Sequence, residues 1–125
     1  MRLTRLDGAY AVARTAADAP VPAGLLEGAG FRTVARTPDE LSAVFPEAAL
    51  PGLAFDRVEG GWACFQVAGP LAFTETGIVA GISAALAEAG IGIFVVSTYD
   101  TDYVLVKAAE ADRAVAAWRA AGHDV

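Results

Sequence analysis

The hydrophobic pattern in the second half of the chain changes from the period of a strand to that of a helix. Trp62–Val67 alternates between two faces, which predicts a strand. Over Thr76–Ala89 the apolar positions recur at helical spacing and predict one buried stripe. Thr74 or Thr76 is the expected N-cap of this helix. The stripe consists of Ile78, Val79, Ile82, Leu86 and Ala89.

Two more strands and a second helix follow. Ile91–Val96 is an almost unbroken β-branched and aromatic run, typical of a strand covered on at least one face. Tyr99–Asp102 has the composition of a turn, and Tyr103–Val106 returns as a strand. Glu110–Ala121 is helical, and His123–Val125 leaves room for a last short strand. The order strand, helix, strand, strand, helix predicts an α+β unit.

The first half is less regular. Ala9–Thr15, Phe31–Thr37 and Leu41–Phe45 have the composition of strands, and Ala23–Glu27 that of a turn or short helix. The T-P-D-E turn after Phe31–Thr37 echoes the later T-Y-D-T-D turn, which fits an internal repeat and a coincidence of turn residues equally well. Pro46–Gly61 is the expected connector, so the predicted parts are residues 1–60 and 61–125.

Composition narrows the classes of protein. The 125 residues are 55% hydrophobic and 19% charged, enough for a core and unlike a disordered chain. The longest apolar runs are far shorter than the ~20 residues of a membrane span, and Met1–Tyr10 is unlike a signal peptide, so we expect a cytoplasmic protein without a membrane partner. The net charge of −6 includes no basic stripe, which argues against nucleic acid.

Groups for catalysis are sparse. The single histidine, His123, lies near the chain end, and the single cysteine, Cys64, lies within a predicted strand. Asp100 and Asp102 could act as paired carboxylates, but the needs of a turn account for both. We therefore expect no catalytic residue, no metal site and no cofactor.

The segment Gly69–Ile78, G-P-L-A-F-T-E-T-G-I, is the most informative one. It leads from a strand into a helix whose first N–H groups could hold a carboxylate or phosphate. Gly77 lacks a Cβ and would permit a ligand or another backbone to come close. A capped helix with a tight entrance explains the same residues without a ligand.

These motifs carry a resemblance. Val67–Lys107, with G-P-L-A-F-T-E-T-G-I and S-T-Y-D-T-D-Y, resembles the C-terminal ACT domain of short bacterial ACT-domain proteins, a subtype also found in the metazoan CASTOR arginine sensors. Phe31–Val44 resembles the first, degenerate ACT-like unit of that family. The resemblance implies tandem ACT-like, ferredoxin-like βαββαβ units, with antiparallel sheets and helices on one face.

The resemblance also implies a ligand site where two such units meet, and a non-enzymatic regulatory protein, most simply a homodimer, that binds an amino acid. The residues that correspond to the site are Gly69, Pro70, Leu71, Thr74, Thr76, Gly77, Ile78, Ser97, Thr98, Asp100, Thr101 and Asp102. Two alternatives remain: an assembly module that binds no ligand, and a small enzyme of ferredoxin-like build.

Overall fold

The structure, a computed structural model, describes residues 1–125 and divides into two compact units. The N-terminal unit is Asp7–Trp62, and the C-terminal unit joins Met1–Leu6 to Ala63–Val125. Strand β5 (Arg57–Val67) contributes residues to both units. Neither helix of the protein has the length and apolar character that crossing a bilayer requires.

The N-terminal unit is an antiparallel sheet in the order β3–β4–β2–β5. Its own strands are β2 (Tyr10–Thr15), β3 (Thr33–Arg36) and β4 (Leu41–Pro46), close to the three predicted ones, and a 3-10 helix, η1 (Glu47–Gly52), follows. No α-helix occurs in this unit. Small and aromatic side chains form its core, and Phe45 stacks on Phe55 with ring centroids 5.5 Å apart.

The predicted connector Pro46–Gly61 is wrong at its C-terminal end. β5 already begins at Arg57, so the last residues of the expected loop form a strand. Gly61, at the predicted end of the connector, has a φ of 71° and is accommodated inside the strand. The register between β2 and β5 shifts between Tyr10 and Val12, as at a β-bulge.

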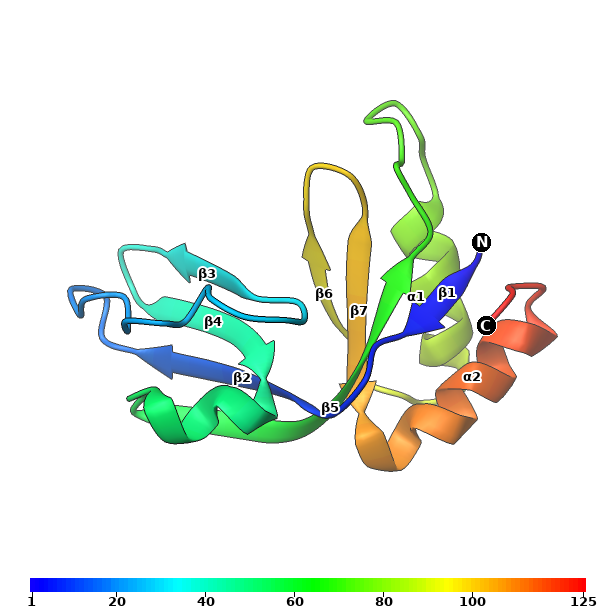
Figure 1. The fold of residues 1–125 in the computed structure, drawn as a ribbon. Helices are drawn as coiled ribbons and strands as arrows, with labels where there is room; N and C mark the ends of the chain where they lie inside the picture. Colours follow the sequence, from blue (N-terminus) through cyan, green and yellow to red (C-terminus); the bar gives the residue numbers. More distant parts are fainter. The chain divides into compact units, whose positions relative to one another are not determined.

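The C-terminal unit is a four-stranded sheet with helices on one face (Figure 1). Its strands lie in the order β1–β5–β7–β6, with β1 (Leu3–Arg5) antiparallel to β5. β6 (Phe94–Ser97) and β7 (Asp102–Lys107) form a hairpin. The helices are α1 (Ile78–Glu88) and α2 (Ala111–Ala120), the latter preceded by the 3-10 turn η2 (Ala108–Glu110).

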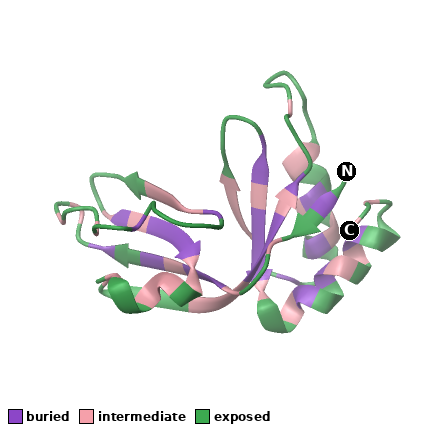
Figure 2. Cartoon of the chain, viewed as in Figure 1, coloured by how far each residue is buried: buried purple, intermediate pink, exposed green.

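The core of this unit lies between the sheet and the helices. Phe65 of β5 meets Trp118 of α2 edge to face, with ring centroids 4.9 Å apart. The Trp118 Nε1–H donates to the carbonyl of Ile82, 3.1 Å away, so the indole is satisfied although it is fully buried. Ile82 and Leu86 are buried as the helical pattern predicts, and Figure 2 shows the buried positions on the inner sides of both helices.

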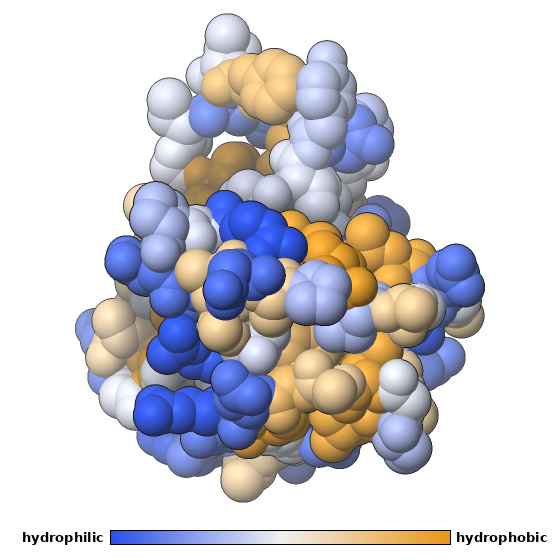
Figure 3. Space-filling view, turned by 90° about the vertical axis from the view of Figure 1, so that its left-hand side faces the viewer, coloured by the Kyte–Doolittle hydropathy of each residue, from blue (hydrophilic) through white to orange (hydrophobic).

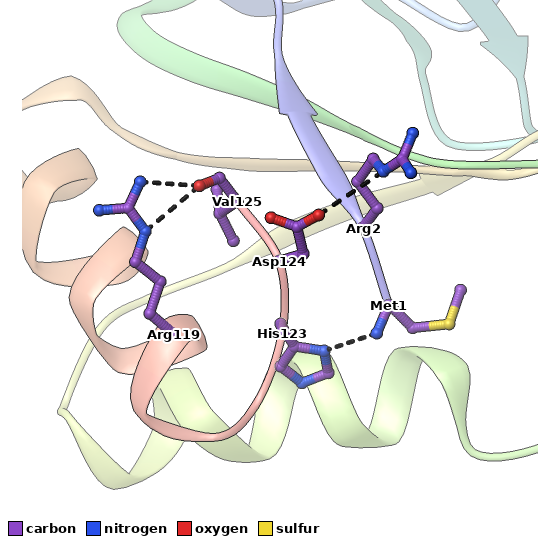
Figure 4. Close-up of polar contacts among 6 residues, drawn as sticks. All are labelled: Met1, Arg2, Arg119, His123, Asp124 and Val125. Atoms are coloured by element: carbon purple, nitrogen blue, oxygen red, sulfur yellow. Dashed lines mark hydrogen bonds and ion pairs between the residues drawn. The ribbon is translucent and has the colours of Figure 1, made fainter.

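The two ends of the chain lie side by side in this unit. The sequence pattern groups Leu3–Arg5 with residues 1–60, but in the structure Leu3 pairs with Val67 of β5 and lies in the C-terminal core. The expected strand at His123–Val125 is reduced to a single parallel bridge between Arg2 and Asp124. Figure 4 shows the side-chain contacts there, including Arg2 Nε 3.7 Å from Asp124 Oδ2.

Candidate functional site

The loop between β5 and α1 is fixed to the β6–β7 turn at its beginning. The Leu71 N–H donates to the carbonyl of Asp100 at 2.6 Å, and the Thr101 hydroxyl donates to the carbonyl of Val67 at 2.6 Å. A Cβ on Gly69 would lie 2.9 Å from the Asp100 carbonyl oxygen. Since that oxygen belongs to the backbone, only glycine allows so close an approach. The Gly69–Pro70 peptide bond is cis.

The rest of the loop, Ala72–Gly77, is exposed, as Figure 2 shows. Its hydrogen bonds are local: the Ala72 N–H donates to Glu75 Oε1 at 2.9 Å, and the Glu75 N–H to the Ala72 carbonyl at 3.0 Å. Thr74 and Thr76 lie on its exposed surface.

Helix α1 begins without a capping side chain. The expected caps, Thr74 and Thr76, are wrong, because Gly77 occupies the N-cap position with a φ of 78°. A residue in this left-handed conformation turns the loop sharply into the helix, which glycine does without steric cost. No side chain accepts a hydrogen bond from the first turn, so the N–H groups at this end have no side-chain partner. This end of α1 carries the positive pole of the helix dipole.

The β6–β7 turn supplies the opposite charge. Asp102 is only 9% exposed, and its Oδ1 accepts a hydrogen bond from the Ser97 hydroxyl at 2.5 Å. Thr98 and Thr101 close the turn through the Thr98 N–H, which donates to the Thr101 carbonyl at 2.8 Å. Asp100 is exposed at the middle of the turn. The Asp102 carboxylate is thus fixed by a hydrogen bond, and the Asp100 carboxylate lies exposed on the same short segment.

A cavity of about 400 Å³ lies between the β5–α1 loop, the start of α1 and the β6–β7 turn. Figure 3 shows a hollow near the top of the molecule, at the height at which Figure 1 places the loop and the turn. The residues that line the cavity are Leu71, Ala72, Phe73, Glu75, Gly77, Ile78, Val79, Ala80, Ser97, Thr98, Tyr99, Asp100, Thr101 and Asp102.

The cavity brings together most of the residues expected at a ligand site. Of these, Leu71, Gly77, Ile78, Ser97, Thr98, Asp100, Thr101 and Asp102 line it. Gly69, Pro70, Thr74 and Thr76 do not line it; Gly69 instead sets the distance between loop and turn. The sequence did not single out Phe73, Glu75 or Tyr99, which also line the cavity. The only indication in the sequence that these three residues belong to the site is their position within the motifs G-P-L-A-F-T-E-T-G-I and S-T-Y-D-T-D-Y.

The lining has the chemistry of a binding site with two poles. Its charged side chains are the carboxylates of Glu75, Asp100 and Asp102, and it contains no lysine, arginine or histidine. Opposite charge comes only from the uncapped N–H groups of α1. Such a cavity can accept hydrogen bonds from a cationic group at one wall and donate hydrogen bonds to an anionic group at the other.

Of the residues considered for catalysis, Cys64 and His123 lie outside this cavity, whereas Asp100 and Asp102 line it. Cys64 is fully buried, and burial raises the pKa of its thiol from 9.0 to about 12, so the nucleophilic thiolate is strongly disfavoured. The His123 ring lies against the chain's own N-terminus, with Nδ1 3.4 Å from the Met1 amine (Figure 4). No group of histidine, cysteine and acidic side chains in the structure could hold a metal ion.

Comparison with known proteins agrees with this architecture. Residues 57–119 match the model of a family described as ACT domain. A crystal structure of protein Atu0741 from Agobacterium tumefaciens is 42% identical, with a TM-score of 0.87, and the match covers 98% of this chain and 90% of that one. A search of curated proteins gave no significant match.

More distant structures share the fold. A Vibrio cholerae protein described as being of unknown function and a possible transport protein is 21% identical, with a TM-score of 0.70 over 96% of this chain and 88% of that one. The ligand-free regulatory subunit of aspartate kinase from Thermus thermophilus is 18% identical, with a TM-score of 0.64 over 96% and 97%. The family match spans half of the residues, and it includes the whole loop, helix and hairpin around the cavity. The chain therefore belongs to the ACT-domain family.

Proposed function

We propose that this protein is a non-enzymatic regulatory protein that binds an amino acid in the cavity at the start of α1. The observation that carries the proposal is the pairing of the uncapped helix start with the carboxylates of Asp100 and Asp102 around one cavity. An α-amino acid has the complementary pair of charges. Its carboxylate would accept hydrogen bonds from the helix N–H groups, and its ammonium group would face the turn.

The comparisons support a regulatory role by analogy. The Thermus thermophilus neighbour is named as a regulatory subunit of aspartate kinase, and its fold extends over nearly all of both chains. The small residues around the cavity also leave room for an amino acid, because Gly77 and Ala80 contribute little side-chain volume. In this proposal the N-terminal unit, which has strands but no α-helix, is a degenerate ACT-like unit.

A thermal-shift screen with each of the twenty L-amino acids tests the proposal. At least one of them should raise the Tm of the parent protein, because a ligand that binds only the folded state stabilises it by mass action. The Gly77→Val variant should lose this rise, since a branched side chain at the N-cap would narrow the approach to the helix N–H groups.

Gly90→Val is the matched control. Gly90 has a φ of 73°, close to the 78° of Gly77, and a Cβ at either position would meet no atom within 4 Å. Both substitutions therefore strain the backbone to a similar degree and should lower the Tm of the free protein alike. Gly90 does not line the cavity, so its variant should keep the ligand-induced rise. If Gly77→Val also keeps it, the ligand lies elsewhere.

A second candidate function is assembly without a ligand. It is favoured by a shallow hollow on the outer side of α1, lined by Ala80, Ser83, Ala84, Ala87, Ile91 and Ile93. Small and apolar side chains of this kind permit another protein surface to pack closely. Absence of any response in the amino-acid screen would make assembly the better description.

A further inference from the structure

The most exposed large apolar side chains of the protein are a pair. Phe73 is 75% exposed and Tyr99 is 80% exposed, more than any other large hydrophobic residue. They come from different segments, Phe73 from the β5–α1 loop and Tyr99 from the β6–β7 turn, yet their rings meet edge to face with centroids 4.8 Å apart. Both residues line the cavity. Exposed apolar surface beside a cavity indicates contact with a ligand or a partner.

The ring pair is the contact that joins the outer part of the loop to the turn. The hydrogen bond between Leu71 and Asp100 fixes the base of the loop. Beyond that base, the hydrogen bonds of Ala72–Gly77 stay within the loop or belong to the start of α1, and none reaches the turn. Separating the rings would therefore let the outer loop move away from the turn without breaking a hydrogen bond.

We propose that Phe73 and Tyr99 form a gate over the cavity, which parts to admit the ligand and then closes on it. This inference rests on the proposed binding of an amino acid. In the proposed complex, Asp100 and Asp102 bind the ammonium group of the ligand and the N–H groups of α1 bind its carboxylate. The rings then cover the remaining part of the ligand, its side chain. The gate makes the ligand dissociate slowly and favours amino acids whose side chain extends to the rings over glycine and alanine.

The first measurement is the dissociation rate of the L-amino acid that gives the parent protein its largest rise in Tm. Phe73→Ala and Tyr99→Ala should each increase this rate at least about tenfold, because the ligand loses its cover. Tyr99→Phe keeps the ring and should behave like the parent protein. Leu26→Ala, which removes an exposed apolar side chain of the N-terminal unit, is the matched control and should leave the rate unchanged.

The second measurement separates a gate from simple surface packing. If the rings act as one gate, the double variant Phe73→Ala/Tyr99→Ala should dissociate no faster than either single variant, because removing one ring already opens the gate. Hydrogen exchange of the Ala72–Gly77 amides without ligand should be faster in Tyr99→Ala than in the parent protein.

The outcomes distinguish the gate from the function on which it rests. If no amino acid stabilises the parent protein, the proposed function fails, and the gate fails with it. If an amino acid binds the parent protein but leaves both alanine variants with the parent's dissociation rate, the gate is overturned while the proposed function stands. Additive effects of the two substitutions would also overturn the gate, since the rings would then act separately.

Discussion

At the scale of the residue, Gly69 shows how a side chain that is absent can shape a site. Its Cα lies so close to the β6–β7 turn that an added Cβ would be 2.9 Å from the carbonyl oxygen of Asp100 and 3.0 Å from the Cβ of Thr101. The turn and the loop are therefore held at a fixed distance by backbone groups and by the Thr101 hydroxyl. The cavity lies between the same two segments, although Gly69 itself does not line it.

Cys64 gives a prediction about pH. Burial raises the pKa of its thiol to about 12, so the folded protein keeps this proton over a range in which the unfolded chain, with a pKa near the ordinary 9.0, has lost it. The folded state then binds more protons than the unfolded state, and the free energy of unfolding should fall as the pH rises above about 9. Below that pH both states are protonated, and Cys64 should contribute no pH dependence.

Urea unfolding of the parent protein and of Cys64→Ala at a series of pH values checks this. The difference between the two free energies of unfolding should be constant below about pH 9 and should then change by at most about 1.4 kcal/mol per pH unit. Other groups that titrate in this range are common to both proteins and cancel in the comparison. Parallel curves up to about pH 11 would show that the thiol is not protected by burial.

At the scale of the element, α1 has two different tasks. Its N-terminus faces the cavity, whereas its buried stripe, Ile82 and Leu86, packs in the core together with Trp118. The same helix therefore links the position of the binding groups to the packing of the unit. A substitution in the stripe should affect stability first, and binding only through stability.

Leu86→Ala tests which face of α1 is buried. Leu86 is fully buried, and its truncation should lower the free energy of unfolding by about 2–5 kcal/mol through lost contacts and a cavity. Glu88 is exposed on the same helix, and Glu88→Ala should change stability by less than about 0.5 kcal/mol. Urea melts of the two variants make the comparison, and equal losses would mean that the packing of α1 is different.

The elements that could be predicted from the sequence are those with a long local pattern. The strand at Trp62–Val67 and the stripe of α1 were visible because their periodicity extends over several residues. β1 could not be predicted, because three residues carry no clear period and their partners lie far along the chain. The start of α1 was misplaced since Thr74 and Thr76 are good caps in isolation, while the φ of Gly77 depends on the path of the loop.

The candidate site was predictable in part for the same reason. Turn residues such as Thr98 and Asp102 act through partners a few positions away, so their roles can be inferred locally. Phe73 and Tyr99 were not assigned to the site, although both lie within the two motifs, because their contact joins segments that are distant in sequence. The hydrogen bonds from Leu71 to Asp100 and from Thr101 to Val67 hold these two segments together near the rings.

At the scale of the whole molecule, we expect two copies of the chain to associate. The hollow lined by Ala84, Ala87 and Ile91 leaves apolar surface on the outer side of α1, and β6 ends the strand order of its unit. Light scattering at micromolar concentration should give twice the 12.8 kDa of one chain. Ala84→Glu should halve this mass, because a buried unpaired charge opposes association.

Ala116→Glu is the control for the dimer. Ala116 is exposed on α2, away from the hollow, so its substitution should leave the mass unchanged. A mass of one chain for the parent protein would show that the hollow is not an interface between copies, and the fold described here would be unaffected.

The pairing of β1 with β5 determines the order in which the two units can be completed during synthesis. All residues of the N-terminal unit have been made once Trp62 has been added. The C-terminal unit contains residues made before and after that unit, because Leu3 pairs with Val67 and Arg2 forms a bridge with Asp124. Leu3 and Arg2 can therefore form these pairs only after residues far along the chain have been synthesised. The C-terminal unit, which contains the cavity, can therefore complete its fold only after all residues of the N-terminal unit have been available for folding.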